Sequence, residues 1–95
     1  QYPAVEHDLA IVVDNTVTCE DLERRIASSG GKLLEGVRLF DVYRDPIRIG
    51  AGKKSMAFAL TYRSDDHTLT SEEVEKAHQK IVTKVCKGVN GEVRG

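Results

Sequence analysis

Residues 53–63 alternate regularly between large, mostly apolar side chains and small or polar ones, and this pattern predicts a β-strand with one buried face. The large face carries Lys54, Met56, Phe58, Leu60 and Tyr62, and the small face carries Lys53, Ser55, Ala57, Ala59, Thr61 and Arg63. Such a strand needs a covering layer over its large face only. The rest of the chain must supply that layer.

The N-terminal part of the chain predicts a strand followed by a short helix. Residues 8–14 are apolar at alternate positions and end in a turn-forming Asp-Asn pair. Thr18 is a candidate N-cap, and Asp21, three residues later, can complete a capping box with it. Apolar residues follow at helical spacing. We therefore expect a strand over 8–14 and a helix over 19–29, ended by the two glycines that follow.

The C-terminal part predicts two further strands and a second helix. Residues 33–44 are rich in strand-forming side chains, and a loop with one proline and two glycines joins them to the strand over 53–63. Thr70 is the cap of a helix with an apolar stripe, and Gly88 is expected to end that helix. Residues 92–94 are long enough only for a short closing strand.

The element order β-α-β-β-α-β predicts an α+β fold. In this ferredoxin-like sandwich a four-stranded antiparallel sheet carries both helices on one face, and its other face is uncovered. Strand alternation predicts the residues that face the helices: Leu9, Ile11, Val13, Phe40, Val42, Met56, Phe58 and Leu60. It sends the intervening residues to the uncovered face: Ala10, Val12, Leu39, Asp41, Tyr43, Ser55 and Ala57.

The predicted uncovered face is shallow because most of its side chains are small or polar. It offers an aromatic ring at Tyr43, a carboxylate at Asp41 and a hydroxyl at Ser55. Such a surface suits a flat ligand such as an unstacked nucleobase. Two plainer roles stay open, since Tyr43 can lean over the hairpin as a surface residue and Asp41 can pair with a basic neighbour.

Composition limits the partners of this surface. The 95 residues suffice for one domain, and 40% apolar with 31% charged residues is typical of a soluble globular domain. Fourteen Lys and Arg against fifteen Asp and Glu give a net charge of −1, which excludes a strongly basic nucleic-acid binder. A module that reads a polyanion through a few well-placed contacts stays possible. No apolar run reaches the roughly 20 residues of a membrane helix. The chain begins with glutamine, and we expect it to be a piece of a longer protein.

Residues with reactive or metal-binding side chains show no catalytic pattern. Cys19 and Cys86 form no paired motif, and we expect both to be reduced, cytosolic thiols. The three histidines have no metal-ligand spacing. Lys53 and Lys54 follow glycines but enter a strand, whereas a phosphate loop enters a helix. We expect solvated lysines there, with contact to a phosphate backbone as the alternative.

Several blocks of the chain resemble the ferredoxin-fold anticodon-binding domain that closes the β chain of bacterial phenylalanyl-tRNA synthetase. The blocks are Pro3-Ala4-Val5, Asp8-Leu9-Ala10-Ile11-Val12-Val13-Asp14, Gly31-Lys32-Leu33-Leu34, Leu39-Phe40-Asp41-Val42-Tyr43, Gly52-Lys53-Lys54-Ser55-Met56-Ala57-Phe58 and Thr68-Leu69-Thr70-Ser71-Glu72-Glu73-Val74. They follow one another in the family's order over nearly the whole chain. The resemblance implies a single anticodon-binding domain over 1–95, a fragment of a longer chain.

The resemblance also implies site residues. In the family, the F-D-x-Y strand and the serine after the lysine pair lie at the anticodon, and these positions are Asp41, Tyr43 and Ser55 in this chain, with Ala10 beside them. Lys53 is the candidate phosphate contact next to them. Strand alternation alone already places these residues on the uncovered face.

The implied function is recognition of the anticodon stem-loop of phenylalanine tRNA within phenylalanyl-tRNA synthetase, a cytoplasmic α2β2 ligase of protein biosynthesis. In that family aminoacylation with ATP and magnesium belongs to the α chain, so we expect no catalytic residue, cofactor or metal here. The expected partners are the tRNA stem-loop, the rest of the β chain and the α chain, with no membrane. Two alternatives stay open: an acylphosphatase-like enzyme, which would turn over an acyl phosphate, and a small-molecule regulatory domain, which would bind free phenylalanine tightly.

Overall fold

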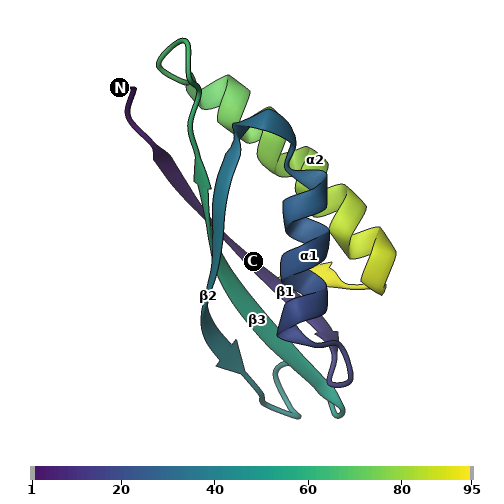
Figure 1. Ribbon diagram of the computed structural model, residues 1–95. Coiled ribbons are helices and arrows are strands. Elements are labelled where there is room, and N and C mark those ends of the chain that lie inside the picture. The colour runs from purple at the N-terminus through teal and green to yellow at the C-terminus, as the bar shows by residue number, and fades with distance from the viewer. Residues whose placement is uncertain (1, 95) are drawn as a thin grey trace.

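The computed structural model describes residues 2–94 as one twisted sheet with two helices on the same face (Figure 1). The elements are β1 (Val5–Asp14), α1 (Cys19–Ser29), a 3₁₀ turn (Gly31–Leu33), β2 (Leu34–Tyr43), β3 (Lys53–Tyr62), α2 (Ser71–Val89) and β4 (Glu92–Val93). The strand order is β2-β3-β1-β4, and every neighbouring pair is antiparallel. The predicted ferredoxin-like α+β sandwich is therefore confirmed.

The two central strands, β1 and β3, pair without interruption from Val5 opposite Tyr62 to Asp14 opposite Lys53. Because side chains alternate along each strand, this register places the large side chains of both strands on the helix side. The buried core comprises Leu9, Ile11 and Val13 of β1, Met56, Phe58, Leu60 and Tyr62 of β3, Leu22 and Ile26 of α1, and Val74, Ile81 and Val85 of α2. The predicted inward positions of the two central strands are confirmed.

Strand β2 departs from the predicted alternation at Phe40. Leu39 pairs with Phe58 and Asp41 pairs with Ala57, so Phe40 is the extra residue of a β-bulge. The prediction that Phe40 faces the helices and Leu39 the uncovered face is wrong, because Leu39 packs against the core whereas Phe40 is 49% exposed. After the bulge the strand alternates as predicted.

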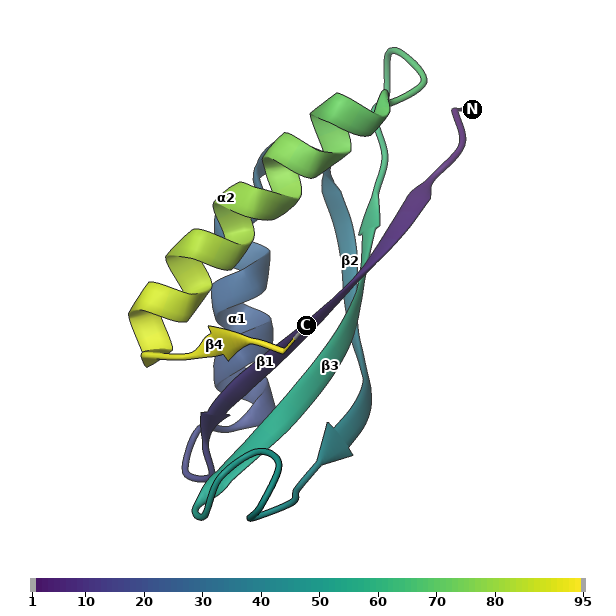
Figure 2. The same cartoon turned by 180° about the vertical axis from the view of Figure 1, so that it is seen from behind.

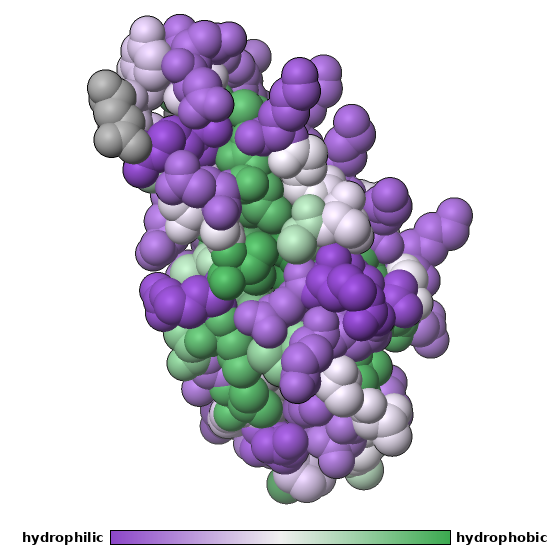
Figure 3. Space-filling view, in the orientation of Figure 1, coloured by the Kyte–Doolittle hydropathy of each residue, from purple (hydrophilic) through white to green (hydrophobic). Residues whose placement is uncertain are grey.

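Strand β2 is also the edge of the sheet, and Figure 3 shows an apolar strip that follows it. Leu34, Val37 and Leu39 are partly buried and pack against the core from this edge. Val42 pairs with Met56 and faces the helix side as predicted, but it is 39% exposed. The apolar layer therefore thins toward the end of β2.

The helices begin at the predicted caps, Thr18 and Thr70, whose side chains accept hydrogen bonds from backbone N–H groups of the first turn. The end of α2 differs from the prediction, because the helix continues through Gly88 to Val89. Asn90 follows in the left-handed conformation with φ of 54°. Asparagine adopts this conformation more readily than most side chains do, so it ends the helix in place of glycine.

Cys19 and Cys86 are free and partly buried. Burial raises the pKa of both thiols, at Cys19 and at Cys86. Neutral thiols react slowly, because the thiolate is the nucleophile. Both side chains therefore serve as small packing groups.

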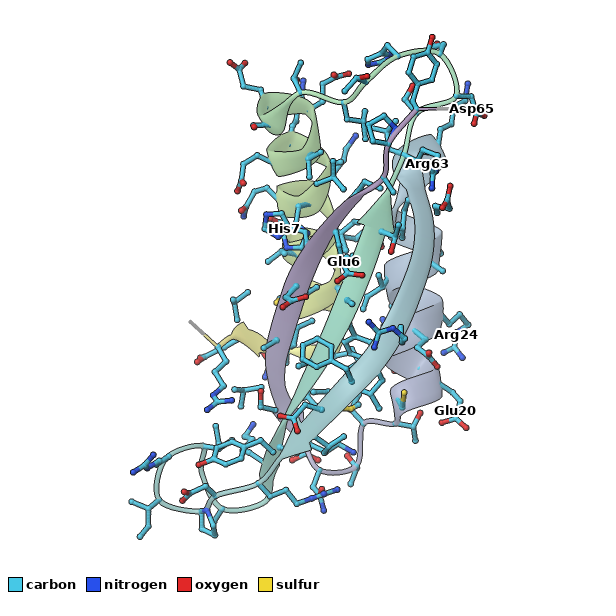
Figure 4. All side chains as sticks on the ribbon, turned by 90° about the vertical axis from the view of Figure 1, so that its left-hand side faces the viewer. Glu6, His7, Glu20, Arg24, Arg63 and Asp65 are labelled. Carbon is cyan, nitrogen blue, oxygen red and sulfur yellow. The ribbon has the colours of Figure 1, made fainter. Side chains whose placement is uncertain are left out.

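Two of the histidines come together at the border of β1 and α2, where Figure 4 labels His7. The His7 and His78 rings stack with their centroids 4.0 Å apart, and Tyr62 Oη lies 2.8 Å from His78 Nδ1. Burial, and to a smaller extent the charge of His7, lower the pKa of His78, whereas the charge of Glu75 opposes this shift. Burial also raises the pKa of Tyr62 to about 12.

We predict that His78 makes the fold sensitive to mild acid. Since its pKa is lower in the folded chain than the usual value of about 6.5, the unfolded chain takes up its proton first as the pH falls. The free energy of unfolding should therefore decrease below that pH in the wild type and change less in His78→Asn, which keeps an acceptor for Tyr62. Urea titrations at several pH values measure this difference, and parallel curves for the two proteins would contradict it.

The control for this experiment is His67→Gln. Hydrogen bonds to Asp66 and Glu73 raise the pKa of His67, so protonation of His67 stabilises the fold, whereas protonation of His78 destabilises it. The stabilisation by His67 is present at low pH and is lost as the pH rises through the raised pKa. His67→Gln should therefore make the acid sensitivity of the fold steeper.

Candidate nucleic-acid interface

Figure 4 looks onto the face of the sheet that neither helix covers. The strand register arranges side chains on this face in rows across β1, β3 and β2. Val12, Ser55 and Tyr43 form one row, and Ala10, Ala57 and Asp41 form the next. Neighbouring rows lie about 7 Å apart. The structure therefore brings together four of the predicted site residues: Ala10, Asp41, Tyr43 and Ser55.

Lys53 lies at the margin of these rows. It is exposed at the first position of β3, opposite Asp14. Lys54 is on the other face of the strand and is only 8% exposed. The expectation of two solvated lysines is therefore right for Lys53 and wrong for Lys54. Of the pair, only Lys53 is placed to meet a phosphate group beside the site.

Arg94 completes the site and was not among the predicted residues. Its backbone N–H donates to the Ala10 carbonyl at 2.9 Å, beside the short pairing of β4 with β1 that Figure 2 shows. Gly91 permits this close approach, because a Cβ there would lie 2.8 Å from the Ile11 side chain. From this anchor the guanidinium reaches over the sheet, and its Cζ lies 4.5 Å from the centre of the Tyr43 ring.

Ser55 is buried in the row that ends at Tyr43. Ser55 is only 2% exposed, although no helix covers its face. In the register Ser55 stands between β1, where Arg94 is anchored, and Tyr43 on β2. The contact between the guanidinium and the Tyr43 ring therefore spans the row in which Ser55 lies.

Asp45 joins Tyr43 to the loop between β2 and β3. Tyr43 Oη donates to Asp45 Oδ2 at 3.0 Å, and Asp45 Oδ1 accepts from the backbone N–H groups of Ile47 and Arg48 at 3.0 and 3.1 Å. The hydrogen bond to Asp45 raises the pKa of Tyr43, and the backbone donors lower the pKa of Asp45. The ring and the loop are therefore held as one unit, with the Ile47 side chain 95% exposed at the tip.

Charge is unevenly distributed over the uncovered face. Arg44, Arg48 and Lys53 lie in or beside the β2–β3 loop, and Arg94 is next to them. Toward the opposite end the face carries Glu6, Asp8 and Glu35 together with Arg38 and Arg63. Figure 4 shows Glu6 on the sheet and Arg63 near that end. The loop end thus carries the cations nearest to Tyr43, but the carboxylates of Asp14, Asp41 and Asp45 stand among them.

Sequence reasoning missed Arg94 and Asp45. The signal for Arg94 was the predicted fold itself, because a closing strand beside the first strand places its residues next to Ala10. Asp45 stands before a proline in a turn, where its carboxylate can accept hydrogen bonds from the backbone two and three residues later. Neither pattern by itself indicated contact with Tyr43.

Within residues 2–94 no three His, Cys, Asp or Glu side chains are placed to hold a metal ion. Neither helix in this part of the chain has the length and apolar character needed to cross a membrane.

The fold and the face correspond to a known class of domain. The family model of the ferredoxin-fold anticodon binding domain matches residues 1–94, and the chain therefore belongs to this family. It is 45% identical over 94 residues to the phenylalanine–tRNA ligase beta subunit of Clostridium tetani. These residues make up 99% of the chain and 12% of that relative. The Bacillus subtilis beta subunit is 50% identical over 82 residues, or 86% of the chain and 10% of the relative. The chain thus spans about a tenth of the length of such relatives.

We predict that Arg94 stacks on Tyr43 in solution. Aromatic ring current should shift the side-chain protons of Arg94 upfield in the NMR spectrum, and Tyr43→Leu should abolish the shift. A cation over an exposed ring contributes about 0.5–1 kcal/mol, so Arg94→Ala should lower the free energy of unfolding by about that amount. Arg38→Ala on the same face is the control and should have a smaller effect. An Arg94 spectrum that is unchanged in Tyr43→Leu would contradict the contact.

Proposed function

We propose that this chain is the anticodon-binding domain of a phenylalanine–tRNA ligase beta subunit and that its uncovered sheet face binds the anticodon stem-loop of phenylalanine tRNA. The family membership and the names of the relatives support the class of function. The observation that carries the site is the placement of Tyr43, Asp41 and Ser55 in adjacent rows of a face without helices. A ring with a carboxylate and a hydroxyl beside it suits one unstacked base.

In this proposal a base of the loop stacks on Tyr43 in the place of the Arg94 guanidinium. Asp41 accepts hydrogen bonds from amino or imino groups at the base edge, as acidic side chains do. Ser55 stands next to Tyr43 in the same row and supplies a hydroxyl that donates or accepts. Ala10 keeps the floor of the site low, so that a planar ligand can approach the strands closely.

The cations at the loop end contact phosphates in this proposal. Lys53 and Arg48 are exposed beside Tyr43 and can pair with the backbone on either side of the bound base. Such contacts position the RNA but carry no sequence information. With a net charge of −1, the domain gains little general attraction, so we expect its affinity for a stem-loop alone to be weak.

The chemistry of the ligase lies outside this chain in our proposal. Aminoacylation would use ATP and magnesium on the α chain, and within residues 2–94 no cluster of carboxylates or imidazoles offers a site for the ion. The remaining partners would be the rest of the beta subunit and the α chain, in the cytoplasm. The domain would thus contribute recognition alone to the longer protein of which it is a fragment.

We predict salt-dependent binding of the anticodon stem-loop. A labelled stem-loop of phenylalanine tRNA should bind the protein weakly, and its affinity should fall as salt rises because phosphate contacts release counterions. Fluorescence anisotropy at two salt concentrations measures this effect. A stem-loop with a scrambled loop is the control and should bind more weakly. Equal affinity for both loops would count against anticodon recognition.

We predict that Tyr43→Ala raises the Michaelis constant for tRNA in the full-length ligase by roughly tenfold to a hundredfold, since base stacking on a ring is worth about 1–3 kcal/mol. Amino-acid activation should not change. Tyr43→Phe should be mild, because the ring remains and Asp45 keeps its backbone donors. Steady-state charging kinetics measure the Michaelis constants of the two variants, and pyrophosphate exchange measures amino-acid activation.

The lysine controls separate base recognition from phosphate contact. Lys53→Ala should weaken all tRNAs alike if it contacts phosphate, and Lys32→Ala, an exposed lysine of the 3₁₀ turn, should have no effect. Lys54 is unsuitable as a control because it is nearly buried. If Tyr43→Ala charges tRNA as the wild type does, with its circular dichroism intact, Tyr43 is only a surface residue.

A further inference from the structure

The β-bulge in β2 exposes a second aromatic ring on the uncovered face. Phe40 is the inserted residue, and it is 49% exposed although the residues on either side of it follow the sheet register. A large apolar side chain exposed halfway along an edge strand gains no burial in the free protein. Bulges are common beside binding sites, where they redirect a side chain, so the ring at Phe40 is a candidate ligand contact.

Phe40 borders a shallow hollow of about 210 Å³ on that face. Its other lining residues are Glu6 and Asp8 of β1, Arg38 of β2 and Ala59 of β3. Ala59 is the floor, because its small side chain leaves space between the flanking strands. Glu6, Asp8 and Arg38 are exposed, and within the described residues none of them forms an ion pair. The hollow therefore offers a ring and three charged groups that the fold itself does not use.

We infer that this hollow binds a second nucleobase of the same RNA loop, stacked on Phe40. This inference rests on the proposed function and adds a binding site to it. Ser55 and Ala59 are four residues apart on β3, so the two sites lie about 13 Å apart. That is much more than the rise of about 3.4 Å between stacked bases, so the two sites hold separate, splayed bases.

The charges around Phe40 favour a base over a phosphate. The carboxylates of Glu6 and Asp8 accept hydrogen bonds from exocyclic amino groups and repel phosphate oxygens. Arg38 stands on the same strand as Phe40, where its planar guanidinium can stack on the outer side of a base or pair with its phosphate. The site is also continuous with the face that carries Tyr43. An apolar protein segment would leave these three charges without partners, which is costly.

The test uses the full-length protein and anticodon stem-loops in which 2-aminopurine replaces one loop base at a time. Stacking quenches the fluorescence of this base. With the wild type we expect quenching at two separate loop positions, one lost in Tyr43→Ala and the other lost in Phe40→Ala. Phe40→Ala should also raise the Michaelis constant for tRNA by about tenfold, given the usual energy of stacking.

Conservative variants identify what the ring does. Phe40→Tyr keeps an aromatic ring and should retain the quenching, whereas Phe40→Leu keeps only apolar area and should lose it. Val42→Ala is the matched control, since Val42 is also partly exposed on β2 but faces the helix side. Circular dichroism of each variant reports whether the fold is intact.

Each failure has a distinct meaning. If the Tyr43-dependent quenching is present and Phe40→Ala changes nothing, the second site is wrong and the proposed function stands. If Phe40→Leu binds as the wild type does, the residue is an apolar contact for protein, and the inference is again overturned. If no stem-loop binds the wild type, the proposed function fails and the second site fails with it.

Discussion

Ten consecutive antiparallel pairs join β1 to β3, and a slip of one residue in either strand would turn its apolar face to solvent. The same register that buries Leu9, Ile11 and Phe58 sets Ala10, Ser55 and Ala57 on the opposite face. The register between β1 and β3 therefore determines both the core and the candidate RNA surface. Burial of the core fixes the site rows with a precision that no loop could supply.

Strand β2 is free to depart from this regularity because it pairs on one side only. As the edge strand it has no further neighbour within the described residues, so an inserted residue disturbs a single ladder. The insertion allows Leu39 to keep its place in the core while Asp41 and Tyr43 keep theirs on the uncovered face. Phe40 is exposed as the consequence. The edge position thus makes room for an aromatic group that a central strand would have buried.

Local signals explain how much of the fold the sequence predicts. Alternation in β1 and β3 and the caps at Thr18 and Thr70 depend on neighbours in the chain, and these features are confirmed. The bulge could not be predicted, because Leu39 and Phe40 are adjacent and both apolar, so either of them satisfies the alternation. The end of α2 was misplaced since both Gly88 and Asn90 can end a helix, and the choice depends on where β4 docks.

In the candidate site too, features set by local sequence patterns could be predicted, and features set by contacts between distant segments could not. Ala10, Asp41, Tyr43 and Ser55 come together because pairing register alone decides their face, and register follows from the apolar pattern. Arg94 reaches Tyr43 only through the docking of β4 on β1, and Asp45 reaches it through the conformation of a loop. Such contacts join segments whose local patterns say nothing about each other. They require the three-dimensional structure.

The contact of Arg94 with Tyr43 gives the proposed interface a basis for selectivity. Before any ligand binds, Tyr43 already has a stacking partner in Arg94, so a base that replaces the guanidinium must offset the loss of a contact worth about 0.5–1 kcal/mol. The base gains further from hydrogen bonds to Asp41 and Ser55. A base with the wrong edge loses the Arg94 contact without forming these hydrogen bonds, and a hydrogen bond to a charged group contributes about 1.5–3 kcal/mol. Because a base must displace Arg94, stacking alone contributes less to its affinity, and the hydrogen bonds at the base edge decide which base binds. Such discrimination suits a domain whose net charge of −1 gives little general attraction to RNA.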